Sequence, residues 1–207
     1  MPLYTYVCID LKSFYASVEC VNRGLDPFST NLVVADPSRG KGALCLAISP
    51  AMKALGVRNR CRLFEIPAHT RYITAMHRMQ HYIDVSAEIY GIYLQMIAPE
   101  DIYVYSIDEC FINVAPYLHL YKKTPREMAI FLMDTVRRKT GICATAGIGT
   151  NLFLAKVAMD IIAKHVDSHI GLLTEKSFRK TLWHHRHITD IWNIGNGIAR
   201  RLEKYGV

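Results

Sequence analysis

The chain has 207 residues, of which 51% are hydrophobic and 21% are charged. A chain of that length and composition folds into one large or two small globular domains, which excludes an intrinsically disordered or low-complexity protein. Its net charge of +7 favours a polyanionic partner but does not require one, because many basic proteins bind no nucleic acid.

The cysteines and the hydropathy pattern bear on the compartment. Six cysteines are scattered without a Cys-x-x-Cys pair, and several lie in apolar runs, as reduced core cysteines do. We therefore expect a cytoplasmic protein with neither zinc nor disulfides. The N-terminal residues do not have the pattern of a signal peptide, and no apolar run is long enough to cross a bilayer, so no membrane partner is expected.

The first predicted strand covers residues 4–9 and ends at Asp10, and the apolar spacing of residues 13–21 predicts a helix. A carboxylate between a strand and a helix is a common position for a metal or phosphate ligand. It is also a common helix N-cap, and Asp10 alone does not distinguish the two.

Residues 32–35 and 44–48 predict two strands joined by a turn-rich loop, and a short helix follows. Ser49 as the cap, Pro50 in the first helical position and Gly56 after the last turn define that helix. Five basic residues within and after this helix form a cluster. A cluster of basic residues is usually a solvated surface, and it can also face phosphate. Its members are Lys53, Arg58, Arg60, Arg62 and Arg71.

A long helix is predicted over residues 76–98, and a strand over residues 103–111 follows it. Asp108 and Glu109 interrupt that strand, and apolar residues flank the pair. Two neighbouring anions in a half-dry site repel one another, and a divalent metal would relieve the cost of burying them. The competing interpretation is a surface turn that contains the two acids, and these residues alone favour neither.

Residues 124–139 predict a helix that opens with a capping box at Thr124 and Glu127. A buried strand over residues 142–147 and a helix over residues 151–164 follow. An exposed salt-bridge stripe on this last helix would explain its lysines without any function. The charged residues of that stripe are Lys156, Asp160 and Lys164.

Residues 188–202 predict two short helices joined by a glycine-containing turn. The pattern resembles a helix-hairpin-helix, in which backbone N–H groups of the turn and of the next helix hold a DNA phosphate. Any tight helix pair would have a similar sequence.

Together these elements predict an α+β fold, a mixed sheet with helices on one face. If the strands that carry Asp10 and Asp108 are neighbours, three carboxylates converge, with Glu109 as the third. Three converging anions suit a two-metal site for phosphoryl transfer, where the ions steady the attacking and leaving oxygens.

Four segments resemble, in order, the motifs of the Y-family (UmuC-like) translesion DNA polymerases. The resemblance spans nearly the whole chain and implies a catalytic fragment that lacks the family's little-finger domain. The segments are Asp-Leu-Lys-Ser-Phe-Tyr-Ala-Ser-Val-Glu at 10–19, Ser-Pro-Ala-Met-Lys-Ala-Leu-Gly at 49–56, Ser-Ile-Asp-Glu at 106–109 and Gly-Ile-Gly-Thr-Asn-Leu-Phe-Leu-Ala-Lys at 147–156.

The resemblance also implies a domain organisation. Residues 1–13 and 77–165 would form the palm, with a mixed or antiparallel sheet backed by helices. Residues 14–76 would form a small α/β fingers insertion. Residues 166–207 would form part of a helical thumb that contains the helix-hairpin-helix.

The resemblance implies a catalytic set of acids that bind two Mg²⁺ ions. Asp10 and Asp108 would bind both ions, and the Leu11 carbonyl would complete one coordination shell. Glu109 would hold the ion nearest the primer 3′-OH.

The resemblance further implies how substrates are bound. Tyr15 would be the steric gate, with its ring against the sugar so that a ribonucleotide's 2′-hydroxyl clashes, and Phe14 would belong to the same substrate-binding set. Lys53 and Lys156 would contact the phosphates of the incoming nucleotide. DNA would be held by Ile194, Gly195, Gly197 and Arg200.

The chain departs from the family pattern at three places. Lys12 replaces an acidic residue, so no metal role is assigned there. Pro50 replaces a tyrosine and Lys53 an arginine, so the residues of the triphosphate clamp are not fixed. Asn193 replaces the first hairpin glycine, and asparagine tolerates the left-handed conformation better than most residues.

The implied function is error-prone, template-directed DNA synthesis past damage, with primer-template DNA and dNTP as partners. A sliding clamp and accessory SOS proteins would bind through C-terminal parts beyond this chain, and the fragment alone would be weakly active. One alternative is a palm-type nucleotidyl cyclase, which would lack both the helix-hairpin-helix and the steric gate. Another is a non-catalytic DNA-binding remnant, which would be expected to lose carboxylates that are costly to keep together.

Overall fold

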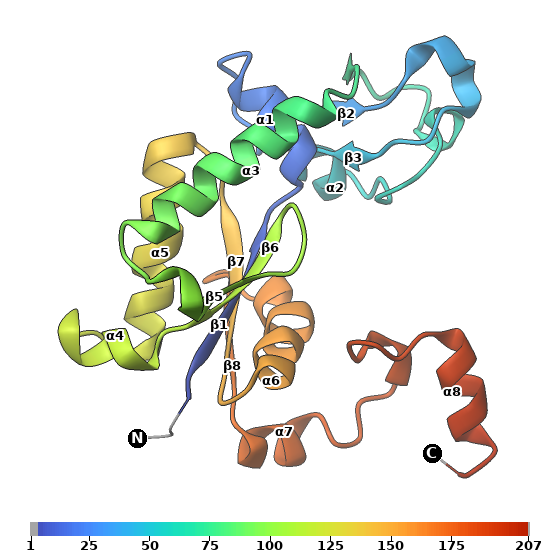
Figure 1. Cartoon of the computed structure of the whole chain (residues 1–207). Helices are drawn as coiled ribbons and strands as arrows, with labels where there is room; N and C mark the ends of the chain where they lie inside the picture. Colours follow the sequence, from blue (N-terminus) through green and yellow to red (C-terminus); the bar gives the residue numbers. More distant parts are fainter. Residues whose placement is uncertain (1–3, 207) are drawn as a thin grey trace. The chain divides into compact units, whose positions relative to one another are not determined.

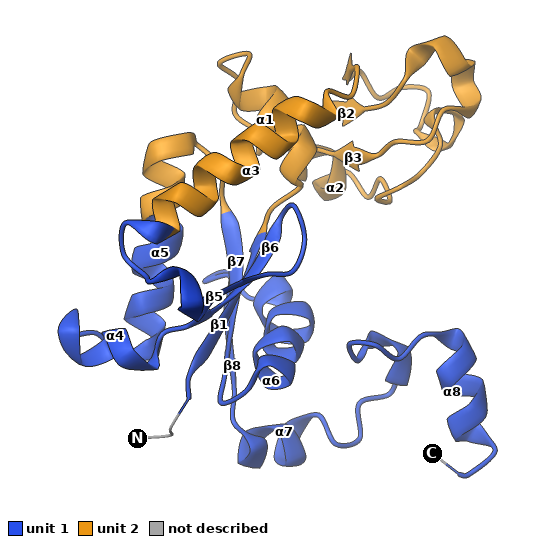
Figure 2. Cartoon of the chain, in the orientation of Figure 1, with its two compact units in different colours: residues 1–10, 94–134, 144–207 blue, residues 11–93, 135–143 orange. Residues whose placement is uncertain are grey.

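The computed structural model describes residues 4–206. By its internal contacts the chain divides into two compact units (Figure 2). The first comprises the described part of residues 1–10, 94–134 and 144–207, and the second comprises residues 11–93 and 135–143. The palm, fingers and thumb boundaries stay a prediction.

The first unit is built on a mixed sheet (Figure 1). Within the described residues its strand order is β5-β6-β1-β7-β8. Strand β6 is antiparallel to both β5 and β1, whereas β7 and β8 are parallel, so the predicted mixed sheet of an α+β protein is confirmed. The strands are β1 (Tyr6–Leu11, whose last residue belongs to the second unit), β5 (Ile102–Val104), β6 (Glu109–Asn113), β7 (Ala144–Gly149) and β8 (Ile170–Leu173).

Helices and short helical turns connect these strands. The helix predicted over residues 151–164 is confirmed, since α6 (Leu152–Val157) continues through a π-helical turn, η4 (Ala158–Ile162), and a 3₁₀ turn, η5 (Ala163–His165). Asn151 caps it by accepting a hydrogen bond from the Leu154 N–H at 2.8 Å. The other elements are η3 (Pro99–Asp101), α4 (Ala115–Leu120), α5 (Pro125–Thr140, shared with the second unit), α7 (Glu175–Thr181), η6 (Ile188–Asp190) and α8 (Asn196–Glu203).

The predicted capping box at the start of α5 is confirmed. The Thr124 N–H donates to the Glu127 carboxylate at 2.8 Å, and the Glu127 N–H donates to the Thr124 hydroxyl oxygen at 3.3 Å. These reciprocal bonds satisfy backbone donors that have no partner within the helix.

The strand predicted over residues 103–111 is wrong in its middle. The chain instead forms a hairpin, in which β5 ends at Val104 and β6 begins at Glu109. The N–H groups of Tyr105 and Ser106 both donate to the Glu109 carbonyl at 3.0 Å, which closes the turn. Asp108 therefore lies in a turn, while Glu109 opens a strand that pairs with β1.

The second unit has a small sheet of its own, with β2 antiparallel to β3 and parallel to β4. Ser49 and Pro50 begin α2 as predicted, and the Ser49 hydroxyl oxygen accepts a hydrogen bond from the Met52 N–H at 3.3 Å. Buried side chains such as Val33, Ile48 and Met52 form its core. The elements are α1 (Phe14–Val21), β2 (Leu32–Val34), η1 (Pro37–Gly42), β3 (Ala47–Ile48), α2 (Pro50–Ala54), η2 (Leu63–Glu65), β4 (Ile73–Ala75) and α3 (Met79–Leu94, whose last residue belongs to the first unit).

Among residues 4–206, no helix combines the length and the apolar character that a membrane span requires. The six cysteines are free thiols.

Candidate active site

The register of β1 and β6 places two of the predicted acids opposite one another. Asp10 pairs with Glu109, and Cys8 pairs with Phe111. Directly opposed residues of an antiparallel pair point to the same face of the sheet, so the carboxyl groups of Asp10 and Glu109 share a face. Asp108 precedes Glu109 in the hairpin turn, where the Ser106 hydroxyl donates to its Oδ1 at 2.7 Å. The condition set for the acids to converge, that β1 and β6 are neighbours, is therefore met.

Helix α6 covers the same face of the sheet. Cys8 and Phe111 form a buried cluster with Ala155 of α6 and Met159 of η4. Since Cys8 lies two residues before Asp10, both side chains point toward this helical run. The charged residues of the run are thereby brought to the acids.

Three glycines on β7 and β8 allow this helical run to lie close to the backbone of the sheet. A Cβ added to Gly147 would lie 2.1 Å from the Ala155 carbonyl oxygen, and one added to Gly149 would lie 2.2 Å from the Ala155 amide nitrogen. A Cβ on Gly171 of β8 would lie 2.3 Å from the Ala158 carbonyl oxygen. The glycines of β7 and β8 therefore fix the depth at which the charged residues of the run lie.

Three charged side chains of alternating sign connect Glu109 with Asp10. The Lys156 ammonium lies 2.8 Å from Glu109 Oε1 and 3.1 Å from Asp160 Oδ2. The Lys164 ammonium lies 2.8 Å from Asp160 Oδ1 and 3.2 Å from Asp10 Oδ2. We call this chain of contacts the charge ladder, in the order Glu109–Lys156–Asp160–Lys164–Asp10. It lies within the first unit.

The charge ladder also corrects the interpretation of Lys156 as part of an exposed stripe. The stripe does make salt bridges at i, i+4 spacing, but the Lys156 side chain is only 9% exposed, against 42% for Lys164. A buried ammonium group is costly unless it is paired, and Glu109 and Asp160 provide that pairing. Lys156 is therefore part of the site and not a solvated residue.

Burial is the largest influence on the pKa of Asp10, and neighbouring charges modify it. Burial raises the pKa of Asp10, the Lys164 ammonium lowers it, and the charges of Asp108 and Glu109 raise it again, leaving the pKa above its ordinary value. For Lys164, burial lowers the pKa, but its ion pairs with Asp10 and Asp160 outweigh burial and leave the pKa raised. Lys164 therefore stays charged at neutral pH.

The three acids suit a divalent cation by donor type. Carboxylate oxygens are the ligands preferred by Mg²⁺, and Asp10 and Glu109 face one another on β1 and β6, with Asp108 adjacent to Glu109 in the chain. Among residues 4–206, no three acidic, histidine or cysteine side chains are already gathered as a ligand set. Lysines neutralise Asp10 and Glu109 instead.

The predicted nucleotide-binding residues of the second unit lie around α1 and α2. Phe14 is buried, and the ring of half-buried Tyr15 stacks on Tyr82, with ring centroids 4.5 Å apart. Lys53 is exposed on α2. Leu11, the predicted carbonyl ligand, is buried at the end of β1.

Sequence reasoning missed a buried carboxylate next to Tyr15. Glu19 accepts hydrogen bonds from Arg78 at 2.9 and 3.0 Å and from the Tyr82 hydroxyl at 2.8 Å, and it also pairs with Arg23. The i, i+4 spacing could have indicated the Arg23 pair. Nothing local indicates the partners that lie 59 and 63 residues away.

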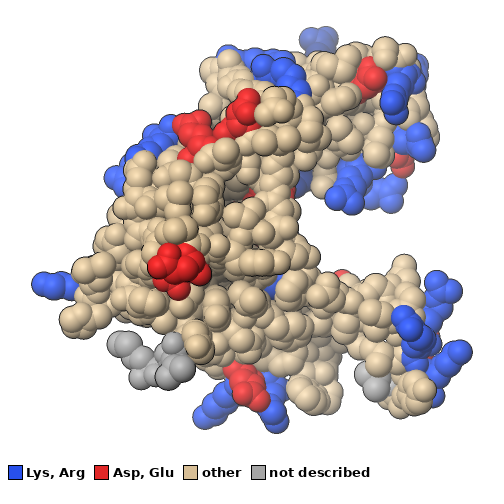
Figure 3. All heavy atoms as spheres, in the orientation of Figure 1, with Lys and Arg blue, Asp and Glu red and all other residues tan. Residues whose placement is uncertain are grey.

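The predicted DNA-binding turn precedes α8. Asn193 adopts the left-handed conformation, with φ of 66°, as expected for a residue in place of a glycine. Gly195 caps α8, and a Cβ on Gly195 or Gly197 would meet no atom within 4 Å. Ile194 is half-buried. Figure 3 shows basic side chains over α8, where Arg200, Arg201 and Lys204 are exposed.

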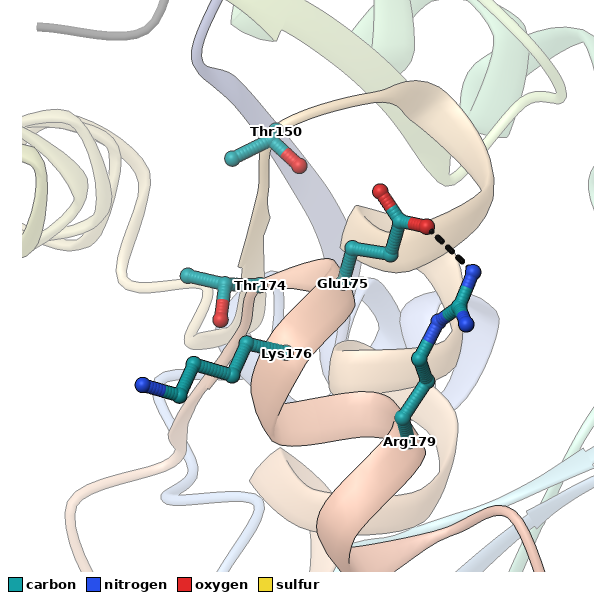
Figure 4. A pocket seen from close by; sticks show the side chains of 5 residues that line it. All are labelled: Thr150, Thr174, Glu175, Lys176 and Arg179. Atoms are coloured by element: carbon teal, nitrogen blue, oxygen red, sulfur yellow. Dashed lines mark hydrogen bonds and ion pairs between the residues drawn. The ribbon is translucent and has the colours of Figure 1, made fainter.

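A shallow surface pocket lies at the start of α7, away from the acids named above (Figure 4). Its one acidic residue is already paired, since Glu175 forms a salt bridge with Arg179 at 2.8 Å. Its polar lining adds nothing to the chemistry of the acid site. The lining residues are Thr150, Thr174, Glu175, Lys176 and Arg179.

Comparison with known proteins identifies the family. Residues 9–160 match the impB/mucB/samB family. UvrX of Bacillus subtilis (strain 168), whose name describes a UV-damage repair protein, is 34% identical over 207 residues, which are 100% of this chain and 48% of that protein. DNA polymerase IV 2 of the same strain is 33% identical over 206 residues, covering 96% of this chain and 47% of that protein. This chain thus spans about half the length of the curated relatives it matches.

Solved structures share the fold. DinB from Sulfolobus solfataricus matches with a TM-score of 0.75 and 24% identity over 98% of this chain and 57% of that one. A Y-family DNA polymerase chimera, Dbh-Dpo4(243-245)-Dbh, matches with a TM-score of 0.78 and 23% identity over 98% of this chain and 58% of that one. The chain belongs to the impB/mucB/samB family, and its fold is that of solved Y-family DNA polymerases, which confirms the resemblance inferred from its motifs.

Proposed function

We propose that this chain is part of a translesion DNA polymerase, which adds nucleotides from dNTP to a primer 3′-OH as directed by a template. The observation that carries the proposal is the pairing of Asp10 with Glu109, with Asp108 adjacent in the chain. Family membership supports the reaction, and the relatives named DNA polymerase IV 2 support the substrate class.

The acids would act as ligands for two Mg²⁺ ions. When bound, the ions would stabilise negative charge on the attacking 3′-oxygen and on the departing pyrophosphate. Asp10 and Asp108 would hold both ions, the Leu11 carbonyl would contribute to one of them, and Glu109 would serve the primer side. The oxygen-only donor set supports this assignment.

The remaining side chains would bind the incoming nucleotide. Lys156 would neutralise triphosphate oxygens, which its position beside Glu109 supports, and Lys53 would do so from exposed α2. Tyr15 would exclude ribonucleotides, and its stacking on Tyr82 supports a fixed ring orientation. Phe14, buried on the same helix, would support this surface.

DNA would be held by the turn before α8, through the backbone of Ile194, Gly195 and Gly197 and the side chain of Arg200. The left-handed Asn193 and the open space at both glycines support close approach of a phosphate. In this proposal the palm, fingers and thumb follow the predicted boundaries. A sliding clamp and SOS proteins would bind other parts of the whole, cytoplasmic protein.

Primer extension past an abasic site tests the proposal. The full-length protein that contains this chain should extend the primer with Mg²⁺ and dNTP. Asp108→Ala should lower the rate at least about a hundredfold, because a ligand for both ions is lost. Asp167→Ala is the matched control, since Asp167 is an exposed aspartate of the same unit. Unchanged extension by the Asp108 variant would refute the assignment.

A further inference from the structure

The charge ladder contains two residues to which the proposed function gives no role. Asp160 contacts both Lys156 and Lys164, at 3.1 and 2.8 Å. Each of these lysines contacts one of the facing acids, Glu109 or Asp10. The acids are thus neutralised by side chains of the chain itself.

We propose that Lys164, positioned by Asp160, is a built-in counter-ion of Asp10 that a divalent cation must displace, so that Lys164 sets the affinity of the acid site for divalent cations. This inference rests on the proposed function, because it takes Asp10 as a metal ligand. It assigns Lys164 and Asp160 roles in admitting the metal and none in the chemical step.

The difference in burial between Lys156 and Lys164 identifies the lysine that leaves its carboxylate partner when a divalent cation binds. The Lys156 side chain is 9% exposed and is held between two carboxylates, whereas Lys164 is 42% exposed. An exposed lysine regains water when it leaves its partner, and its long side chain has many solvated conformations. Lys164 is therefore the exchangeable cation, and Lys156 stays near Glu109.

Asp160 controls where the Lys164 ammonium lies. Its two carboxylate oxygens hold one lysine each, so it competes with Asp10 for Lys164 and with Glu109 for Lys156. Without the Asp160 charge, Lys164 would keep its contact with Asp10 and would neutralise Asp10 more fully. Loss of this charge should therefore weaken cation binding, while loss of the Lys164 charge should strengthen it.

Titration of Mn²⁺ without nucleotide or DNA, with free Mn²⁺ measured by electron paramagnetic resonance, tests the proposal on the full-length protein. Lys164→Gln should tighten Mn²⁺ binding about tenfold, which corresponds to about 1.4 kcal/mol. Asp160→Asn should weaken binding several-fold, and the effect should shrink when Lys164→Gln is also present, because the two residues act through one contact. Lys164→Arg keeps the cation and should stay within about twofold of the wild type.

The controls separate this inference from the proposed function. Lys180→Gln removes an exposed lysine of the same unit and should leave Mn²⁺ binding unchanged. If Asp10→Asn abolishes binding but Lys164→Gln leaves the affinity unchanged, the counter-ion role is wrong and the metal role of Asp10 stands. If Lys164→Gln lowers only the thermal stability, the ion pair is merely structural and the inference is overturned. If the wild-type protein binds no Mn²⁺, the inference and the proposed function both fail.

Discussion

Glu19 on α1 is fully buried, yet it stays ionised because three side chains stabilise its charge. Burial raises the pKa of Glu19, but hydrogen bonds from Arg78, Arg23 and Tyr82 outweigh it and leave the pKa below its usual range. A carboxyl group whose pKa is lowered on folding stabilises the protein above its unfolded pKa. That contribution is lost as the pH falls through the folded-state pKa.

Glu19→Gln should therefore destabilise the protein in a pH-dependent way. At neutral pH we expect a loss of about 2 kcal/mol in the free energy of unfolding, because charge-assisted hydrogen bonds are lost while the exposed arginines can rehydrate. The gap to the wild type should narrow as the pH falls below the unfolded pKa of Glu19, near 4.5. Urea denaturation across this pH range measures it, with Glu88→Gln, an exposed glutamate, as the control. A gap that did not change with pH would contradict this account.

Tyr15 is the residue whose proposed role is most easily isolated. Its ring stacks on Tyr82 at an interplanar angle of 15°, and Tyr82 is anchored to Glu19. Tyr15→Ala removes the ring and should raise ribonucleotide incorporation at least about tenfold relative to deoxyribonucleotides, because the steric clash is lost. Single-nucleotide incorporation assays measure the ratio. An unaltered preference for deoxyribonucleotides would remove Tyr15 from the gate role.

Among the elements, α6 and β7 show how small residues position a site. The run from α6 to η4 lies on Gly147 and Gly149 without intervening side chains. A methyl group at Gly149 would collide with backbone atoms of α6, which cannot rotate away as a side chain can. The lysines that contact the acids would then be displaced.

Gly149→Ala should destabilise the protein by about 3 kcal/mol or more and loosen the charge ladder. Gly91→Ala is a matched control on α3, where a Cβ would meet no atom within 4 Å. There the same substitution should stabilise by about 0.5–1 kcal/mol, because alanine favours a helix. Thermal denaturation followed by circular dichroism measures both changes. A neutral Gly149→Ala would show that the approach of α6 is not essential.

Features coded by nearby residues could be predicted from the sequence. The caps at Ser49 and Thr124 and the left-handed Asn193 each depend on a few adjacent positions. The hairpin at Asp108 was missed because residues 103–107 suit a strand, and only pairing along β5 and β6 shows where the strand breaks. The contact of Lys164 with Asp10 was missed because it depends on the packing of α6 against the sheet.

For the whole molecule, the relatives are about twice as long as this chain. If the 207-residue chain binds primer-template DNA as proposed, we expect it to bind more weakly than the longer DNA polymerase IV 2 of Bacillus subtilis, and with a shallower salt dependence, because a smaller surface would contact fewer phosphates.

Arg200→Ala should lower the slope of log affinity against log salt by about 0.9, as expected for the loss of one phosphate contact. Arg126→Ala, an exposed arginine on α5, should leave the slope unchanged. Fluorescence anisotropy at several salt concentrations measures the slopes. Equal slopes for the wild-type chain, the Arg200→Ala variant and the Arg126→Ala variant would exclude the turn before α8 from DNA binding.

Anomalous diffraction from crystals soaked in Mn²⁺ tests the central claim most directly. We expect manganese peaks within coordination distance of the carboxylates of Asp10, Asp108 and Glu109, with the Lys164 ammonium withdrawn from Asp10. Crystals in which these carboxylates bound no manganese at saturating concentration, and in which the Lys164 ammonium stayed on Asp10, would contradict it.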